Sequence, residues 1–419
     1  MFAARSDLIE EIRDRFAHVE ACPFGGARVF FENAGGALRL KSVIATSAAF
    51  AGYPDNQGRD NPASRALMTA IDKGRADMRL FLNASGGQIF VGESGTEVLF
   101  RLIRTAALGA PEGGIMLGST LEHPASRSAM ARWAEVTGRP HVLVPHDNAT
   151  GSVSLAAYKA MITPQVRVAT IVQTSPVTGM SVDVAAIAAA IRANSHDCLI
   201  IVDGIQHASH GGIDCAAYDA DGYSVSPYKV FARHGYGVGW ASDRLTACSK
   251  EQIIGGAAEN WELGTRDAGA YSTFSDVVDY FDWLGAQVSE ESDRRSRIVA
   301  AAKAIQDHEH DLIGAMIHGL GNARGLAEMP GVTLIGGPGT EAREGVVSLV
   351  LEGMESGALV SFLGDRGIRV HIRNDDHYCG NILKPLGLES CVRVSLCHYN
   401  TEDEVTRFLA AMEAAVAST

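Results

Sequence analysis

Between residues 88 and 242, short apolar runs alternate with longer alanine-rich stretches in which apolar residues recur every three or four positions. The apolar runs predict strands at 88–92, 114–118, 141–145, 167–173, 198–203, 222–226 and 237–241. The stretches between them predict helices at 96–108, 126–137, 155–161 and 184–193. Apolar strands joined by helices indicate a mainly parallel sheet covered on both faces, so the fold class is α/β. Ligands bind at the carboxyl ends of such strands, which makes the polar residues after each strand the candidates for function.

The pattern changes after residue 290. A long helix is predicted at 289–320, followed by strands at 332–335, 345–351, 369–372 and 392–396 and helices at 358–366 and 402–416. This order predicts a small α+β domain. We therefore expect a large domain at 31–290 and a small domain made of 1–30 and 291–419.

Composition narrows the class of protein. The 419 residues are 46% hydrophobic and 20% charged, which excludes disordered and coiled-coil chains. The 36 basic and 49 acidic residues give a net charge of −13, which argues against a nucleic-acid surface. The seven cysteines form no C-x-x-C pair, and no apolar run reaches transmembrane length. We expect a cytoplasmic protein that binds neither membrane nor nucleic acid.

No metal site is expected either. His308 and His310 flank Glu309 on a helix that should be exposed, and their spacing of two does not put both rings on one helix face. The roles of His207 and His210, which follow the strand at 198–203, stay open between lining a pocket and capping a turn.

The segment 200–229 carries the most chemical information. An apolar strand ends in Asp203, Gln206 follows three residues later, and the next strand ends before Lys229. A carboxylate and a lysine in one crevice are costly to bury unless each finds a suitable partner. Pyridoxal 5'-phosphate satisfies both, since Asp203 would hold the pyridine nitrogen protonated and Lys229 would carry the aldehyde as an imine. Gln206 would then contact the ring 3-oxygen.

A phosphate site is also predicted. Gly92-Glu93-Ser94-Gly95-Thr96 joins a strand to a helix, so its backbone N–H groups and the helix dipole can hold an anion. Ser226 can add a hydroxyl. The alternative is a serine hydrolase with Ser94 as nucleophile, but that motif requires glycine where Thr96 stands.

Together these segments resemble a known family. The run DGIQH…SPYK, with TSPVTG before it and GYGVGW after it, is similar to the class V aminotransferases, which are fold-type I pyridoxal-phosphate enzymes. FFENAGGALRL, LEHPASRSA, WELGTRD and VRVSLCHYNTEDEVTRFLAAME extend the similarity over nearly the whole chain. The cysteine-desulfurase-like branch is the most similar. The resemblance implies the fold of that family and an enzyme acting on a small amino acid.

The resemblance also implies roles for single residues. Lys229 would form the internal aldimine, with Asp203 on the pyridine nitrogen, Gln206 on the 3-oxygen and His123 stacked on the ring. The phosphate would be held by Gly95, Thr96 and Ser226, with a weaker expectation for Tyr228, which stands where desulfurases have histidine. Thr265 would reach the phosphate of the neighbouring subunit, which implies a homodimer with shared active sites.

The substrate side is less specific. Arg393 would bind the substrate carboxylate through a two-pronged contact, with Arg373 as a second candidate. Pro176 replaces the asparagine that desulfurases usually carry. Cys379 ends a longer loop than theirs, and Asp375 and Asp376 should raise the pKa of its thiol. Aldimine and quinonoid chemistry of the aminotransferase type is the main prediction. The alternatives are a cysteine desulfurase or β-eliminating lyase, and a scaffold that keeps the fold without catalysis.

Overall fold

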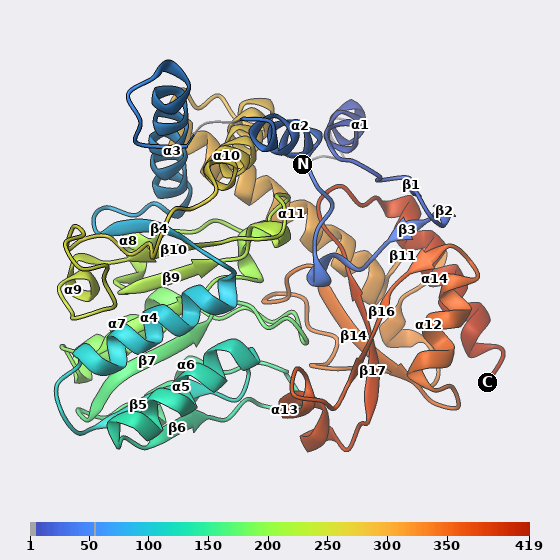
Figure 1. The fold of residues 1–419 in the computed structure, drawn as a ribbon. Coiled ribbons are helices and arrows are strands. Elements are labelled where there is room, and N and C mark those ends of the chain that lie inside the picture. Colours follow the sequence, from blue (N-terminus) through green and yellow to red (C-terminus); the bar gives the residue numbers. More distant parts are fainter. Residues whose placement is uncertain (1–5, 54–55) are drawn as a thin grey trace.

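The computed structural model describes residues 6–53 and 56–419, and two sheets lie side by side in it (Figure 1). The larger sheet has seven strands in the order β4-β10-β9-β8-β7-β5-β6. These strands are β4 (Gln88–Gly92), β5 (Ile115–Ser119), β6 (His141–Val144), β7 (Val166–Val172), β8 (Leu199–Asp203), β9 (Gly222–Val225) and β10 (Gly237–Ala241). The pairs from β6 to β9 are parallel, whereas β10 runs antiparallel to both β9 and β4. The sheet is therefore mainly parallel, as predicted, with an antiparallel strand near one edge.

Helices cover both faces of this sheet. Burial on both sides explains why the sequence of β8 is apolar up to Asp203. Leu199 and Ile201 pack on one side with residues of α4 and α5, while Ile200 and Val202 pack on the other side with α7. Side chains alternate between the two faces of a strand, so every side chain of a strand that is covered on both faces is buried, and apolar residues are favoured at each position. The covering helices are α4 (Gly95–Gly109), α5 (Pro124–Thr137), α6 (Leu155–Met161) and α7 (Val184–Asn194), and the short helices α8 (Cys215–Tyr218) and α9 (Asp243–Thr246) lie between later strands.

Three helices that the sequence pattern did not predict pack beside the large sheet. They are α2 (Lys41–Ala51), α3 (Pro62–Leu82) and α10 (Ala268–Val288). Helix α10 contacts both of the others. A Cβ on Gly74 of α3 would lie 2.5 Å from the Cβ of Tyr271 on α10, so a glycine is needed where these two helices meet. The helix predicted at 289–320 begins later, because Asp293 caps α11 (Arg294–His318) by accepting a hydrogen bond from the Ser296 N–H.

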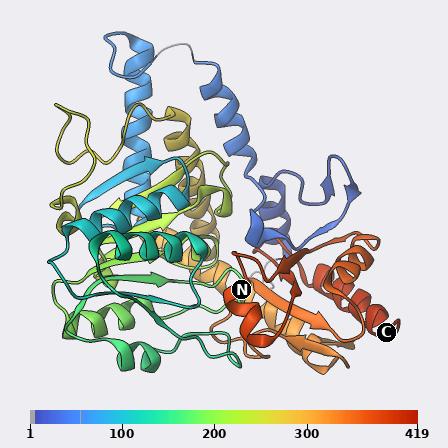
Figure 2. The same ribbon diagram turned by 60° about the horizontal axis from the view of Figure 1, so that its bottom comes forward.

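The smaller sheet has the order β13-β14-β17-β16, all antiparallel. Its strands are β13 (Val332–Leu334), β14 (Val346–Leu351), β16 (His371–Asn374) and β17 (Ser390–Ser395), and α12 (Ser356–Gly364) and α14 (Glu402–Val416) pack against it. Helix α11 joins the two halves: Ile298 and Ile305 belong to the core of the large sheet, while Leu312 and Met316 belong to the core of the small one. Figure 2 shows the same two halves from below.

The N-terminal segment contacts both halves. Phe16, after α1 (Ser6–Arg15), packs edge-on against Phe231 and Tyr280, and Val29 on β3 (Val29–Phe30) lies in the core of the small sheet. Strand β3 pairs in parallel with β15 (Ile368–Arg369), so the strand predicted at 369–372 is two strands, β15 and β16. The division into domains at 31–290 and at 1–30 with 291–419 stays a prediction, and residues 1–5 lie outside the described residues.

Short elements complete the chain. They are the strands β1 (Ala21–Cys22), β2 (Gly26–Ala27), β11 (Gly319–Leu320) and β12 (Ala323–Arg324), the helix α13 (Gly380–Leu383), and the 3-10 helices η2 (Asn33–Gly35), η3 (His207–Ser209), η4 (Pro227–Lys229), η5 (Leu326–Glu328) and η6 (Lys384–Leu386). All seven cysteines are free thiols. Within residues 6–53 and 56–419, every helix is too short or too polar to cross a bilayer.

Candidate active site

A pocket lies at the carboxyl ends of β7, β8 and β9. The register aligns these ends, since Val172 pairs with Asp203 and Asp203 with Ser224. Seven of the residues predicted from the sequence line this pocket together. Its lining residues are Thr96, His123, Val172, Thr174, Pro176, Asp203, Ile205, Gln206, Ser226, Tyr228 and Lys229.

Lys229 projects into the pocket from η4, the turn that follows β9. Its side chain is 8% exposed, and its Nζ donates a hydrogen bond to Gln206 Oε1 at 3.0 Å. Burial, reinforced by the charges of Arg393 and Arg373 and opposed by Asp203, lowers the pKa of Lys229 to about 7. A large fraction of this amine is therefore neutral near pH 7, and the neutral form is the one that attacks a carbonyl or accepts a proton.

Asp203 ends β8 and is 3% exposed. Its Oδ1 accepts a hydrogen bond from the Ile205 N–H at 3.1 Å, and its Oδ2 accepts one from Ser126 Oγ at 3.2 Å. Burial raises the pKa of Asp203, and Lys229 only partly opposes this shift. No ion pair to Asp203 forms within the part of the chain that is described. A buried acid with two donors and no cation is suited to a positively charged partner inside the pocket.

The predicted phosphate site has the form of a cradle at the start of α4. Ser94 caps this helix, its Oγ accepting from the Glu97 N–H at 3.1 Å. A Cβ on Gly95 would collide with Ser226 Oγ and lie 2.7 Å from Ile205 Cδ1, so only glycine leaves the backbone open here. Among the described residues, no hydrogen bond joins Ser94 Oγ to a histidine, so the serine-hydrolase alternative lacks the base that would activate this serine.

His123 caps α5 at the edge of the pocket, where its Nδ1 accepts from the Ala125 N–H at 3.2 Å. Burial and then the charges of Lys229 and of the nearby arginines lower its pKa to about 3. The imidazole is therefore neutral at physiological pH and can lie against an aromatic ring without bringing a charge there. The ring of Tyr378 lies 5.8 Å from that of His123.

Arg393 lies on β17 of the small sheet and is 3% exposed. It does not line the pocket itself but contacts Pro176, which does. Its Nη1 donates to the carbonyl oxygen of Pro176 at 3.0 Å, and its Nε has no hydrogen-bond partner among the described residues. The nearby acid Glu32 pairs with Arg369 at 2.6 Å and with His371 at 3.3 Å instead. Burial, then Arg373, lowers the pKa of Arg393 to about 10. Arg393 is thus a buried cation that forms no ion pair with any carboxylate in residues 6–53 and 56–419.

Arg373 lies on β16, and its Nε contacts the Sγ of Cys379 at 3.0 Å. Cys379 is fully covered, and burial raises the pKa of its thiol although Arg373 and Arg393 oppose the shift. The expected direction of this shift is confirmed, but its cause differs from the prediction. Burial is the largest cause and Asp376 the smallest of those that act on this thiol. The Asp376 carboxylate accepts hydrogen bonds from the Tyr378 and Cys379 N–H groups of its own turn.

Two further residues were predicted to contact the cofactor phosphate, Thr265 and Tyr228. Thr265 is exposed and lies outside the pocket, in a groove lined also by Gln57 and Trp261, so its role toward a neighbouring subunit stays a prediction. Tyr228 lines the pocket, and its ring stacks on His234 at 4.2 Å. This stack holds the His234 ring against a residue that lines the pocket.

Several residues of the site were not predicted. Ser126, which donates to Asp203, lies three residues after His123 and therefore on the same face of α5, a spacing that could have pointed to it. Glu122 is buried beside Thr170, and burial raises its pKa to about 8. Glu309, expected on an exposed face of its helix, is instead buried against His210. Pairing between distant segments determines that contact, and no local pattern reveals it.

These residues fit pyridoxal phosphate on their own chemistry. The pocket combines an amine of lowered pKa, a buried acid without a cation, a glycine cradle at a helix start and a neutral imidazole. Lys229 would hold the aldehyde carbon, Asp203 the ring nitrogen, and the Gly95–Thr96 backbone with Ser226 the phosphate. The unpaired Arg393 remains for an acidic group of the substrate.

The chain is similar to known proteins over most of its length. A cysteine desulfurase of Synechococcus elongatus is 26% identical over 96% of this chain, which spans 63% of that protein's length. A probable cysteine desulfurase of Vibrio cholerae is 25% identical over 97% of this chain and 98% of its own. The apo cysteine desulfurase of Thermococcus onnurineus has the same fold, with a TM-score of 0.80 at 19% identity, covering 94% of this chain and 95% of that one. Residues 29–408 match the sequence profile described as aminotransferase class-V. The chain therefore belongs to the class-V aminotransferase family of pyridoxal-phosphate enzymes.

Proposed function

We propose that this protein transfers the amino group of a small α-amino acid, with Lys229 as the proton-transferring base and Arg393 as the carboxylate anchor. The observation that carries the proposal is the buried Arg393 guanidinium, which has no anionic partner and lies beside an amine of lowered pKa. When bound, pyridoxal phosphate supplies an electron-accepting ring that stabilises negative charge at the substrate α-carbon.

The chain's own residues supply binding and proton transfer. Arg393 holds the substrate carboxylate with two N–H groups, which fixes the α-carbon relative to Lys229. Lys229 Nζ, neutral because of its buried position, takes the α-proton and can return it to another carbon. Asp203 remains ionised opposite a cationic ring nitrogen, and neutral His123 covers the ring face.

The experiment is a spectral screen of the yellow holoprotein against amino acids, followed by identification of the product. We expect a small amino acid to bleach the band near 420 nm and to yield the matching 2-oxo acid. Arg393→Lys should raise KM about 10- to 100-fold, since one prong of the carboxylate contact is lost. The matched control is Arg139→Lys: Arg139 is also buried, at 7% exposed, but donates to backbone carbonyls such as those of Ala107 and Pro111, and its replacement should leave KM unchanged. Unchanged KM in Arg393→Lys would contradict the proposal.

The lowered pKa of Lys229 predicts how cofactor uptake depends on pH. Only the neutral amine attacks an aldehyde, and the pKa is about 7 instead of 10.5. The rate at which the cofactor-free protein reacts with pyridoxal phosphate should therefore rise about tenfold per pH unit below pH 7 and level off above it. Stopped-flow absorbance measures this rate. A rate that still rises steeply at about pH 9 would show an ordinary lysine.

A second candidate function is cysteine desulfuration. The contact between Cys379 Sγ and the Arg373 guanidinium favours it, because a nearby cation stabilises a thiolate. The curated relatives described above carry that name. Against it stands the raised pKa of the covered thiol, which leaves Cys379 protonated near neutral pH.

Sulfide release from cysteine in the presence of a reductant distinguishes the two functions. We expect Cys379→Ala to release sulfide no more slowly than the wild type, because amino-group transfer does not use this thiol. Cys248→Ala, which removes a half-buried cysteine in the loop after α9, is the control for changes in stability. A loss of about 100-fold or more in Cys379→Ala alone would establish the desulfurase.

We also propose that the protein is a homodimer with shared active sites. An exposed Thr265 that lies outside its own pocket supports a homodimer in which this residue reaches the neighbouring subunit's phosphate. Thr265→Ala should then weaken cofactor binding only in the dimer. We also infer that the protein works in the cytoplasm, and its free cysteines are in keeping with a reducing compartment.

A further inference from the structure

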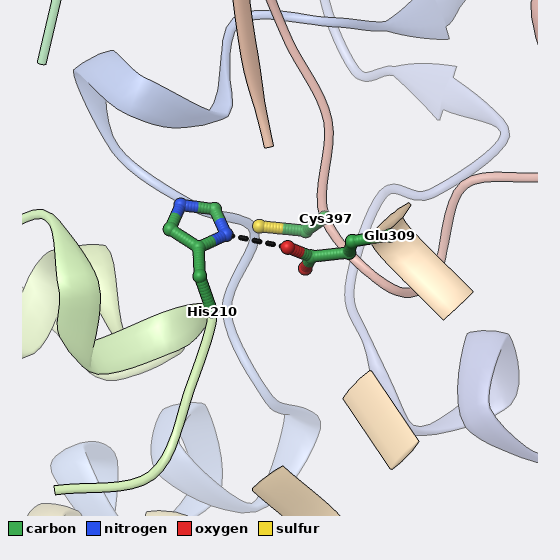
Figure 3. Close-up of side chains that lie close together, drawn as sticks. All are labelled: His210, Glu309 and Cys397. Atoms are coloured by element: carbon green, nitrogen blue, oxygen red, sulfur yellow. Dashed lines mark hydrogen bonds and ion pairs between the residues drawn. The ribbon is translucent and has the colours of Figure 1, made fainter. Parts of the chain in front are cut away.

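A buried polar chain leads from the catalytic lysine to the other half of the molecule. Lys229 Nζ donates to Gln206 Oε1 at 3.0 Å, and the other end of that amide, Nε2, lies 3.2 Å from His210 Nε2. His210 Nδ1 lies 2.6 Å from Glu309 Oε2 on α11. Figure 3 shows the last pair, with Cys397 beside it. His210 and Glu309 are each 2% exposed, so their polar atoms bind protein groups instead of bulk water.

When Lys229 is protonated, as it mainly is at about pH 6, one assignment of protons fits these contacts. The Lys229 ammonium donates and cannot accept, so the amide oxygen of Gln206 faces it and the amide NH₂ faces His210. An amide NH₂ also only donates, which leaves His210 Nε2 without a proton. The single proton of the neutral imidazole is then on Nδ1 and is donated to the Glu309 carboxylate.

Binding of the cofactor requires the opposite orientation of the Gln206 amide. A ring 3-oxygen is an acceptor, so Gln206 must turn its NH₂ toward it and its oxygen toward His210. His210 Nε2 must then carry a proton as well, and the imidazole becomes a cation beside Glu309. Burial alone would lower the pKa of His210, but the Glu309 carboxylate, by charge and hydrogen bond, raises it above its usual value. The added proton can come from water in a cavity of ≈ 310 Å³ that both residues border.

We propose that His210 and Glu309 form a positioning pair for Gln206, which determines which end of the Gln206 amide faces the cofactor. The inference rests on the proposed placement of the cofactor against Lys229 and Gln206. Neither residue touches the cofactor itself. Their effect passes through the Gln206 amide, whose hydrogen bond stabilises negative charge on the ring oxygen.

Other ionisable groups surround the pair. Those that face it are His207, Lys229, Glu344, Cys397, His398, and, around the cavity, Asp307, His310, Glu341 and Arg343. One of them provides a matched control. His207 Nδ1 binds Glu344 at 2.9 Å in a second buried pair that joins the same loop to the small half, but this pair does not contact Gln206. Glu344 raises the pKa of His210 less than Glu309 does and forms no hydrogen bond with His210 or Gln206 among the described residues. Glu344→Gln therefore removes a second nearby carboxylate without breaking a hydrogen bond of the chain that leads to Gln206.

The first experiment measures the colour of the holoprotein against pH. Losing a donor to the ring oxygen should raise the pH midpoint of the band near 420 nm, by about one unit. We expect this shift in Glu309→Gln and in Gln206→Leu, and no further shift in the double variant, because both changes remove the same hydrogen bond. Glu344→Gln should keep a midpoint close to that of the wild type. An unmoved midpoint in Glu309→Gln, or shifts that add in the double variant, would overturn the proposal.

The second experiment starts from the cofactor-free protein at about pH 6, where Lys229 is mainly protonated. Nitrogen-15 NMR of histidine in the cofactor-free protein should show His210 protonated on Nδ1 and bare on Nε2, and cofactor addition should protonate Nε2 in the wild type but not in Glu309→Gln. A proton on Nε2 in the cofactor-free protein would overturn the proposal even if the colour experiment failed. A colourless wild type, in contrast, would contradict the proposed function.

Metal analysis provides one more decisive outcome. The ligand atoms of His210, Glu309 and Cys397 lie within 4.8 Å of one another, a set that could also hold a divalent cation. We expect the purified protein to contain less than stoichiometric zinc, with the same content in Glu309→Gln. If the wild type contained one equivalent of metal and Glu309→Gln contained none, the three residues would form a metal site instead of a hydrogen-bonded pair. That result would overturn the proposal.

Discussion

Lys229→Ala is expected to reduce turnover at least about 10⁴-fold. The variant loses the amine that holds the cofactor and the base that moves the substrate proton, and no other lysine lines the pocket among the described residues. Borohydride treatment followed by peptide mass analysis should find the reduced adduct on Lys229 in the wild type and no adduct in the variant. Turnover is measured with the amino acid found in the spectral screen.

The control for this prediction is Lys159→Ala, which removes an exposed lysine of α6 and should leave both turnover and adduct unchanged. Thermal unfolding of Lys229→Ala should occur at or above the wild-type temperature, since a buried amine of lowered pKa is replaced by an apolar group. Substantial turnover in Lys229→Ala, or an adduct on another lysine, would contradict the assigned site.

Asp203→Asn has the second largest expected effect, a decrease of about 10²- to 10³-fold in kcat. Asparagine can keep a hydrogen bond to Ser126 but carries no charge, so it cannot stabilise a protonated ring nitrogen. The ring then accepts less negative charge from the substrate carbon. Steady-state kinetics and the spectrum of the bound cofactor measure the change, and KM should move much less than kcat.

Asp221→Asn separates this effect from general damage. Asp221 is also fully buried, but its carboxylate is bound by Arg192 at 2.6 Å and by Arg244 at 2.7 Å, away from the pocket. Its loss should lower stability while leaving kcat of the folded fraction unchanged. If both variants lost kcat equally, the effect of Asp203 would be structural instead of chemical.

The local pattern of the chain predicted much of the large sheet. The strand at 88–92 and the helices at 155–161 and 402–416 agree with β4, α6 and α14 to the residue. Apolar strands and capped helices are fixed by local chemistry, and so are their boundaries. The helices α2, α3 and α10 were missed because contacts with one another and with the rest of the chain bury their apolar faces.

The sequence by itself determined the chemistry at the strand ends. Asp203, Gln206 and Lys229 follow buried strands whose carboxyl ends must meet at one edge of a parallel sheet, so their proximity follows from topology alone. Only the tertiary structure decided the pKa of Lys229, the unpaired state of Arg393 and the contact between His210 and Glu309. Each depends on contacts between segments that are far apart along the chain, such as the 217 residues between Arg393 and Pro176, and such distant packing leaves no periodic signal in the sequence.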